Sequence, residues 1–293
     1  MVRFVLHQDL DIIKYNECIT ESSNQRVYAQ SWYLDCIAKK WNALVLNDFE
    51  AVMPLPIRKK YGISYVFVPP WTQQLGVFSK REIGEEMMKE FMFAIPKKFK
   101  LVDILLNSEN YFENRCVRQR DNYILSLEKP YESLYSDFSK GRKSSIKQAI
   151  NHNLTIKKVT STDALLTLFK ANKGLELNRS DADFEILKGL VLKGISLQKI
   201  SVFEVVNSEK ELIGGVIFLI DSHRITYLFS ALNEEGRKKQ AMSFLVDFII
   251  QKFANQPVIL DFEGSMIHAI ASFYRSFGAE LEPYYHYRKK RLL

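Results

Sequence analysis

The chain has 293 residues, of which 47% are apolar and 26% charged, and its formal net charge is +7 at pH 7. This length favours two domains over one, and the composition is typical of a soluble globular protein. The sequence has no apolar run of membrane-spanning length, and Asp9, Asp11 and Lys14 interrupt its first apolar residues. We therefore expect neither a membrane span nor a signal peptide, and a cytoplasmic protein.

The spacing of cysteine and histidine residues argues against two further classes of protein, disulfide-rich proteins and metalloproteins. Cys18, Cys36 and Cys116 are odd in number and form no C-x-x-C pair, which argues against a disulfide framework and a structural zinc site. The five histidines show no H-E-x-x-H or similar spacing. We therefore expect no metal site.

The positive charge is unevenly distributed along the chain. Residues 1–130 have 18 Lys and Arg against 16 Asp and Glu, whereas the remainder has 23 against 18. The excess in the second half would suit an anionic ligand, although general solubility explains it equally well. It is too weak to indicate a nucleic-acid partner.

The first half of the chain has an alternating series of predicted elements. A helix near residues 28–40 comes first, and a hairpin-like pair of strands follows it. Hydrophobic patterning then predicts a strand, a helix, a buried strand, a short helix and a closing strand. The strands lie at 42–47, 50–57, 64–68, 101–106 and 122–127, and the second helix at 82–95.

The second half repeats this order. The predicted helices cover residues 161–176, 181–193 and 237–253, and the strands 199–206, 211–220, 224–231 and 258–264. A short helix and a last strand follow. Helix, three strands, helix, strand, helix, strand therefore occurs twice. We predict two similar α/β units with mixed sheets, residues 1–130 and residues 131–293.

Two segments have unusual composition. Residues 131–153 form a basic helical region, in which the planar guanidinium of Arg142 could clamp a phosphate-bearing substrate. A solvated connecting helix accounts for such charges as well. Residues 69–79 place Trp71, Gln73 and Gln74 in a loop of the kind that lines pockets, here for the acceptor substrate. Packing of Trp71 under the loop is the structural alternative.

Asp261 and Glu263 alternate along the strand at 258–264, so we expect them on one face of it, at an end that borders a ligand crevice. Two buried carboxylates without partners are costly. They indicate either a functional crevice, with Glu263 as general base, or pairing with Arg275 or Arg288.

Arg237, Lys238 and Lys239 open the helix predicted at 237–253. Cations at a helix N-terminus oppose the helix dipole, and an anion docked on the free N–H groups would explain them. Glu234 and Glu235 could equally offset this charge.

Four segments, residues 141–156, 231–250, 260–265 and 271–280, resemble the GNAT acyltransferase superfamily, and most closely its double-domain FemABX-like branch. The resemblance covers most of residues 130–293. In the first half it extends only to the element order and to "SWYLD" and "PPWTQQLG". One position departs from the pattern, because Gln240 replaces a glycine that lets backbone approach phosphate closely.

The resemblance implies two tandem GNAT-like units that transfer an acyl group from an acyl-CoA to an amine. It implies that Tyr274 protonates the departing thiolate and that the loop of the second unit binds the donor. Tyr274 also shares the apolar face of its helix with Ile270 and Phe277, so a core aromatic is the alternative. The implied donor-binding residues are Ser230, Ala231, Leu232, Gly236, Arg237, Lys238, Lys239, Gln240 and Ala241.

Two alternatives stay open beside this interpretation. One is a FemABX-type peptidoglycan aminoacyltransferase that uses charged tRNA, although that branch carries a long helical hairpin and the sequence has no sustained heptads. The other is a binding protein of the same fold without activity, which Gln240 would allow. The sequence leaves the acceptor and the oligomeric state open.

Overall fold

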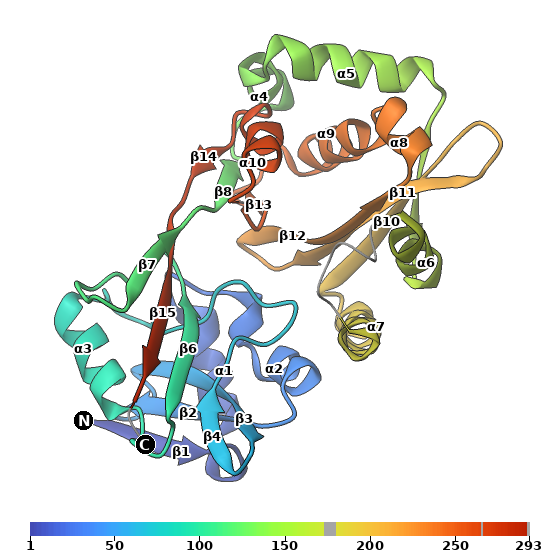
Figure 1. The fold of residues 1–293 in the computed structure, drawn as a ribbon. Helices are drawn as coiled ribbons and strands as arrows, with labels where there is room; N and C mark the ends of the chain where they lie inside the picture. The colour runs from blue at the N-terminus through green and yellow to red at the C-terminus, as the bar shows by residue number, and fades with distance from the viewer. Residues whose placement is uncertain (173–179, 265, 292–293) are drawn as a thin grey trace. The chain divides into compact units, whose positions relative to one another are not determined.

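The computed structural model describes residues 1–172, 180–264 and 266–291, and the chain forms two compact units (Figure 1). The first unit consists of Met1–Asp121 and Glu282–Leu293, and the second of Asn122–Leu281. Each unit contains one mixed sheet with helices packed on it.

The sheet of the first unit is antiparallel except where β4 pairs with β6. Its strand order is β1 (Val2–Leu6), β2 (Trp41–Leu46), β3 (Ala51–Lys60), β4 (Ile63–Val66), β6 (Leu101–Leu106), β15 (Tyr284–Lys290) and β7 (Val117–Arg120), with β5 (Phe78–Ser79) on β3. Its helices are α1 (Ile12–Glu21), α2 (Ser31–Ile37) and α3 (Glu85–Ala94).

Spacing explains how α3 packs in this unit. Met88, Phe91 and Met92 recur at helical intervals and are buried, so one face of α3 covers the sheet. Their partners in the core include Ile104 from β6 and Tyr287 from β15. The C-terminal strand is therefore part of the core of the first unit.

The second unit has the strand order β14 (Glu280–Leu281), β8 (Tyr123–Ser126), β13 (Ile259–Asp261), β12 (Arg224–Leu232), β11 (Leu212–Ile220), β10 (Ile200–Val206) and β9 (Thr155–Val159). Only β12 and β13 pair in parallel. Its helices are α4 (Tyr131–Asp137), α5 (Lys140–Asn151), α6 (Asp163–Asn172), α7 (Asp181–Ser196), α8 (Glu234–Lys238), α9 (Ala241–Phe253) and α10 (His268–Arg275).

Strands β12 and β13 separate after a short paired stretch. Their register ends at the pair of Thr226 with Asp261, while β12 continues to Leu232. The register of β12 against β11 skips Leu228, and a bulge of this kind bends and twists a strand. Within the described chain, β12 therefore has no strand neighbour on its β13 side beyond Thr226.

Two strands lie in the opposite unit from the one that the sequence analysis predicted. Residues 122–127, expected to close the first unit, form β8, which pairs with β13 and β14 in the second sheet. The last strand, expected in the second unit, is β15, which lies between β6 and β7 in the first. The predicted division after residue 130 differs from the units of the structure at both ends, because alternation identifies a strand but not its neighbours.

This exchange also moves the excess positive charge. The first unit has 21 Lys and Arg against 16 Asp and Glu, a balance of +5, and the second unit has 20 against 18. Most of the excess of residues 131–293 therefore lies on the segment that joins the first unit, and its suitability for an anionic ligand stays a prediction.

Two predicted helices also differ from the helices of the structure. The short helix expected before residue 122 does not form, because Asn107 and Asn110 hydrogen-bond the backbone of Leu75 and Val77 instead. The helix predicted at 161–176 is α6 up to Asn172, and its last four residues lie outside the described residues.

Candidate functional site

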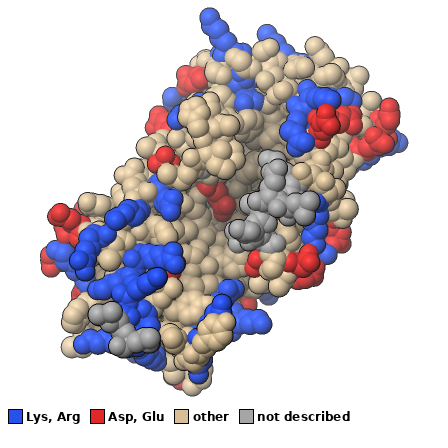
Figure 2. Space-filling model, viewed as in Figure 1, with Lys and Arg blue, Asp and Glu red and all other residues tan. Residues whose placement is uncertain are grey.

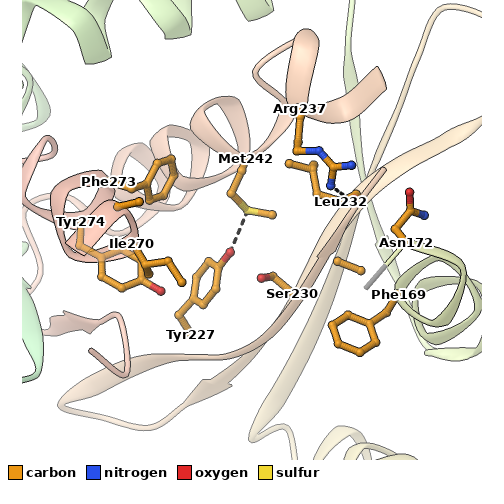
Figure 3. Close-up of a pocket in the computed structure, with 12 residues that line it drawn as sticks. Phe169, Asn172, Tyr227, Ser230, Leu232, Arg237, Met242, Ile270, Phe273 and Tyr274 are labelled. Atoms are coloured by element: carbon orange, nitrogen blue, oxygen red, sulfur yellow. Dashed lines mark hydrogen bonds between the residues drawn. The ribbon is translucent and has the colours of Figure 1, made fainter. Parts of the chain in front are cut away.

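A pocket of about 330 Å³ lies in the second unit along the open edge of β12 (Figure 3). Tyr227 and Ser230 of β12 form its floor, and Met242 from the first turn of α9 lies opposite them. Ile270 and Phe273 of α10 line one end. The separation of β12 from β13 creates the opening, because a paired strand would fill it.

The other end of the pocket combines one cation with an apolar wall. Arg237 lies there beside Asn172 and Phe169 from the end of α6, as Figure 3 shows. The guanidinium of Arg237 donates to the carbonyl of Leu232 at 3.0 Å, which holds it near the end of β12. The pocket therefore has a basic end and an end with phenol groups.

Tyr274 lines the phenolic end and is 8% exposed. Its ring stacks on Phe262 at 4.6 Å and lies 6.3 Å from the ring of Tyr227, centroid to centroid. Burial raises the pKa of Tyr274 well above 10.0, and the nearby Tyr227, Glu263 and Asp261 raise it further. The phenol therefore stays protonated at neutral pH and can donate a proton.

Tyr227 supports this end of the pocket. Its hydroxyl donates to the sulfur of Met242 at 2.9 Å, which connects β12 to α9 (Figure 3). Burial raises the pKa of Tyr227, so this phenol is neutral as well.

Glu263 lies in the turn after β13, half-buried and with a left-handed φ of 55°. Its N–H donates to the carboxylate of Asp261 at 2.8 Å, which fixes the turn. Glu263 is outside the set of residues that line the pocket, but its charge acts on Tyr274. The two residues that sequence analysis named for catalysis are thus electrostatically coupled.

Asp261 and Glu263 do not share a strand face, because β13 ends at Asp261 and Glu263 is left-handed. Asp261 is fully buried and pairs with Arg224 at 2.6 Å, so the expected partners Arg275 and Arg288 are wrong. Both carboxylate oxygens have partners inside the protein, one in Arg224 and one in the Glu263 N–H. Asp261 therefore supports the turn that carries Glu263, and its contact with a substrate stays a prediction.

The helix predicted at 237–253 does not start at Arg237. Gln240 adopts a left-handed φ of 59° and separates α8 from α9, which begins at Ala241. The cations thus lie in and just after the last turn of α8, where the helix dipole favours them. Lys238 and Lys239 pair with Glu234 and Glu235, one turn earlier, at 2.8 and 2.6 Å. The alternative that these acids offset the charge is confirmed, and the cations need no anion to explain them.

The N-terminus of α9 nevertheless lies beside the pocket. The first turn of α9 carries the pocket residue Met242. The side chain of the N-cap residue, Gln240, accepts no hydrogen bond from the N–H groups of this turn. The first N–H groups of a helix have no partner within the helix and attract anions. An anion-binding position beside the start of α9 would thus depend on the free N–H groups of the helix and not on the charges of Arg237, Lys238 and Lys239.

The remaining predicted donor residues divide into two groups. Ser230, Ala231 and Leu232 line the pocket from β12. Gly236 and Ala241 are buried in packing, and a Cβ at Gly236 would meet the carbonyl of Ile213 at 2.2 Å. Gly236 is thus required by close packing of α8 on β11.

Arg142 is not an exposed clamp. It is 9% exposed, and its guanidinium donates to the hydroxyl groups of Ser276 (2.9 Å) and Ser243. The rings of Phe273 and Phe277 lie 4.2 and 4.6 Å from it. Arg142 therefore faces inward, and a direct contact with a phosphate-bearing substrate stays a prediction.

The acceptor residues predicted in the first half are buried within the first unit. Gln74 accepts from Arg26 at 3.3 Å and donates to Gln73 at 2.9 Å. The carbonyl of Trp71, which has a left-handed φ of 59°, accepts from the hydroxyl of Tyr33. These contacts agree with the structural alternative, and substrate binding by the loop stays a prediction.

Sequence analysis missed most of the apolar pocket wall. Its members share helical or strand spacing that indicates core packing, so nothing in the pattern distinguished them from ordinary core residues. They are Phe169, Tyr227, Met242, Ala269, Ile270 and Phe273, and the polar Asn172 at the end of α6 was missed as well.

A search of the described residues finds no cluster of three or more His, Cys, Asp or Glu that could hold a metal ion. Among the helices described, none has the length and apolar character needed to cross a membrane.

A basic surface lies on the exposed part of the first sheet, over β7, β15 and the last residues of β3, and Figure 2 shows Lys and Arg gathered over this part of the molecule. Ile104 and its partner Tyr287 are buried, so their neighbours along the strands face outward. Asp103 lies on this face and pairs with His286 at 2.6 Å and with Arg288 at 3.4 Å. The cations of the face are Arg58, Lys60, Arg118, Arg120, Arg288 and Lys290.

Comparison with known proteins shows the fold. No family model matches the sequence, and no curated protein matches it. Among solved structures, FemX is 12% identical with a TM-score of 0.67, over 94% of this chain and 96% of that chain. L-PGS from Bacillus licheniformis is 14% identical with a TM-score of 0.59, over 97% and 93%. A tandem GNAT protein from the clavulanic acid biosynthesis pathway is 9% identical with a TM-score of 0.55, over 98% of both. The chain thus has the FemX-like, tandem GNAT double-domain fold.

Proposed function

We propose that this protein is an N-acyltransferase that moves an acyl group from an acyl-CoA-type thioester to an amine. The observation that carries the proposal is the pocket on the open edge of β12, with the Tyr274 phenol at one end, Arg237 at the other and the start of α9 alongside. An open strand edge offers N–H and C=O groups to a ligand that contains amides, as the pantetheine arm does. The phosphate groups of the donor would lie at the N-terminus of α9, near Arg237.

The chemistry needs no covalent enzyme intermediate. The amine nitrogen attacks the thioester carbonyl, the new C–N bond forms, and the C–S bond breaks. Tyr274, which its raised pKa keeps protonated at neutral pH, gives its proton to the departing thiolate. Glu263 accepts the proton of the amine, directly or through water. Each side chain thus has one role in proton transfer.

Ligand-induced stabilisation tests the donor. Thermal unfolding is measured with acetyl-CoA, longer acyl-CoAs and free CoA, each at 100 times its dissociation constant, where binding adds about 2.7 kcal/mol of stability. We expect an increase in Tm with CoA species. No change with any of them would contradict the proposed donor.

Turnover tests the base. Glu263→Gln is expected to keep donor binding and to lose amine acylation, because a neutral amide accepts no proton at neutral pH. The shift in Tm with CoA serves as the control for folding. Full activity of this variant would exclude Glu263 as base.

The basic surface of the first sheet favours a second candidate, aminoacyl transfer from charged tRNA to an amine. Six cations on one sheet face would attract a phosphate backbone. Filter binding with aminoacyl-tRNA distinguishes the two candidates. Arg118→Glu together with Lys290→Glu should weaken tRNA binding under the second candidate and leave CoA binding unchanged under the first.

A further inference from the structure

Arg142 is a buried cation whose contacts are all with neutral groups. They are two serine hydroxyl groups and two phenylalanine rings, and within the described residues no carboxylate pairs with it. Burial lowers the pKa of Arg142 to about 10, so its guanidinium stays charged at neutral pH. A buried charge without a counter-ion is costly, and packing alone would be served better by an apolar side chain.

The position of this charge indicates what it serves. Arg142 contacts Ser243, the third residue of α9, so a positive charge adjoins the positive end of a helix. Two like-signed features at one place disfavour each other until an anion neutralises both. The phosphate groups of the proposed donor are such an anion.

A chain of hydrogen bonds continues from Arg142 to the turn before α9. Ser243 accepts from Arg142 and donates its hydroxyl to the side-chain oxygen of Gln240 at 3.2 Å. Gln240 is left-handed, a conformation that glycine adopts freely and other residues adopt at a cost. The amide nitrogen of the Gln240 side chain contacts the carbonyl of Arg237 at 3.4 Å, so both polar atoms of this side chain have partners.

We propose that Arg142 is a positioning residue for the phosphate groups of the donor. Through Ser243 it holds Gln240 in the left-handed turn, which directs the first N–H groups of α9 toward the pocket, and its charge strengthens the positive field there. Gln240 plus Arg142 and Ser243 thus replace the glycine that the sequence lacks at this turn. The inference rests on the proposed function, because the donor must carry phosphate groups.

The experiment compares two probes that differ in their phosphate groups. Dissociation constants of CoA and of pantetheine, which has no phosphate, are measured by calorimetry for wild type and Arg142→Met. We expect the variant to bind CoA about tenfold more weakly and pantetheine with little change, because only CoA presents phosphate to the helix. Ser276→Ala is the matched control. It removes the other hydroxyl partner of Arg142, leaves the link to Gln240, and should bind CoA like wild type.

A second set of variants tests the link itself. Ser243→Ala should weaken CoA binding in the wild-type background and should change it little in a Gln240→Gly background, where glycine holds the turn unaided. Equal losses in both backgrounds would overturn the positioning role. So would equal losses for CoA and pantetheine in Arg142→Met, because these indicate general structural damage. A wild-type protein that binds no CoA contradicts the proposed function as well, whereas wild-type binding with an unaffected Arg142→Met contradicts this inference alone.

Discussion

Tyr274 has the surroundings that an acid catalyst needs. Aromatic rings bury it, and the phenol of Tyr227 and the charge of Glu263 both disfavour its ionisation. Its pKa therefore lies above 10.0, and the proton stays on the oxygen throughout the neutral range. The same burial that suits a core residue keeps Tyr274 protonated, as the proposed role requires.

We expect Tyr274→Phe to lower kcat by about 10²-fold or more and to change KM little, because the hydroxyl acts on the leaving group in the transition state. Steady-state kinetics with an acyl-CoA and an amine measures both constants. Since the pKa is raised, the wild-type rate should not fall between pH 7 and pH 9 through loss of this proton. A variant that raises KM alone would show that Tyr274 only binds the donor.

The pair of Asp261 and Arg224 predicts an effect on stability rather than on chemistry. Asp261→Asn removes the carboxylate charge of the buried pair with Arg224, and breaking a buried ion pair costs about 3–5 kcal/mol. Urea unfolding at pH 7 measures this loss. Asp137→Asn is the control, because Asp137 is 57% exposed and lies 3.9 Å from its partner Lys129. Similar stability of the two variants would show that the buried pair contributes little.

At the scale of elements, the short helix α8 sets where α9 begins. Asn233 caps α8 by accepting from the N–H of Gly236 at 2.7 Å, and the helix ends before the left-handed Gln240. The sequence does not reveal this break, because the five residues of α8 and the start of α9 together read as one continuous helical pattern. The break turns the start of α9 toward the pocket and supplies the proposed anion position.

Gly236→Ala should destabilise the second unit by about 1–3 kcal/mol, because its Cβ would meet backbone and cannot be accommodated without a shift of α8. Gly189→Ala is the matched control in the same unit. Outside the backbone of its own helix, no atom of the described residues lies within 4 Å of a Cβ there, and Gly189 is inside α7, so alanine should stabilise by roughly 0.5–1 kcal/mol. Urea unfolding of both variants gives the comparison, and destabilisation of equal size would contradict the packing argument.

At the scale of the whole molecule, the two units exchange terminal strands. The chain leaves the first unit after Asp121, completes the second, and returns at Glu282 to place β15 between β6 and β7. An inserted central strand hydrogen-bonds on both sides, and Tyr287 contributes a buried ring to the core. The first unit therefore cannot complete its sheet until the last residues of the chain are available.

Tyr287→Ala should destabilise the first unit by about 3–5 kcal/mol by removing a buried aromatic ring. Hydrogen exchange read by mass spectrometry reports the two units separately. We expect faster exchange in β6 and β7 and unchanged exchange in β11 and β12. Lys289→Ala, an exposed position on the same strand, is the control. Faster exchange in both units would show that they unfold together.

The sequence by itself determined most of the element order, the mixed α/β class and the resemblance to tandem GNAT proteins, because hydrophobic periodicity and segment order are local properties. It also singled out Tyr274, Arg237 and the residues 230–232, which the structure brings to one pocket. Tertiary structure alone decided the strand exchange, the Arg224 partner of Asp261, the inward direction of Arg142 and the apolar pocket wall. Each of these depends on contacts between residues distant in the chain, and periodicity gives the face a side chain occupies but not what lies opposite it.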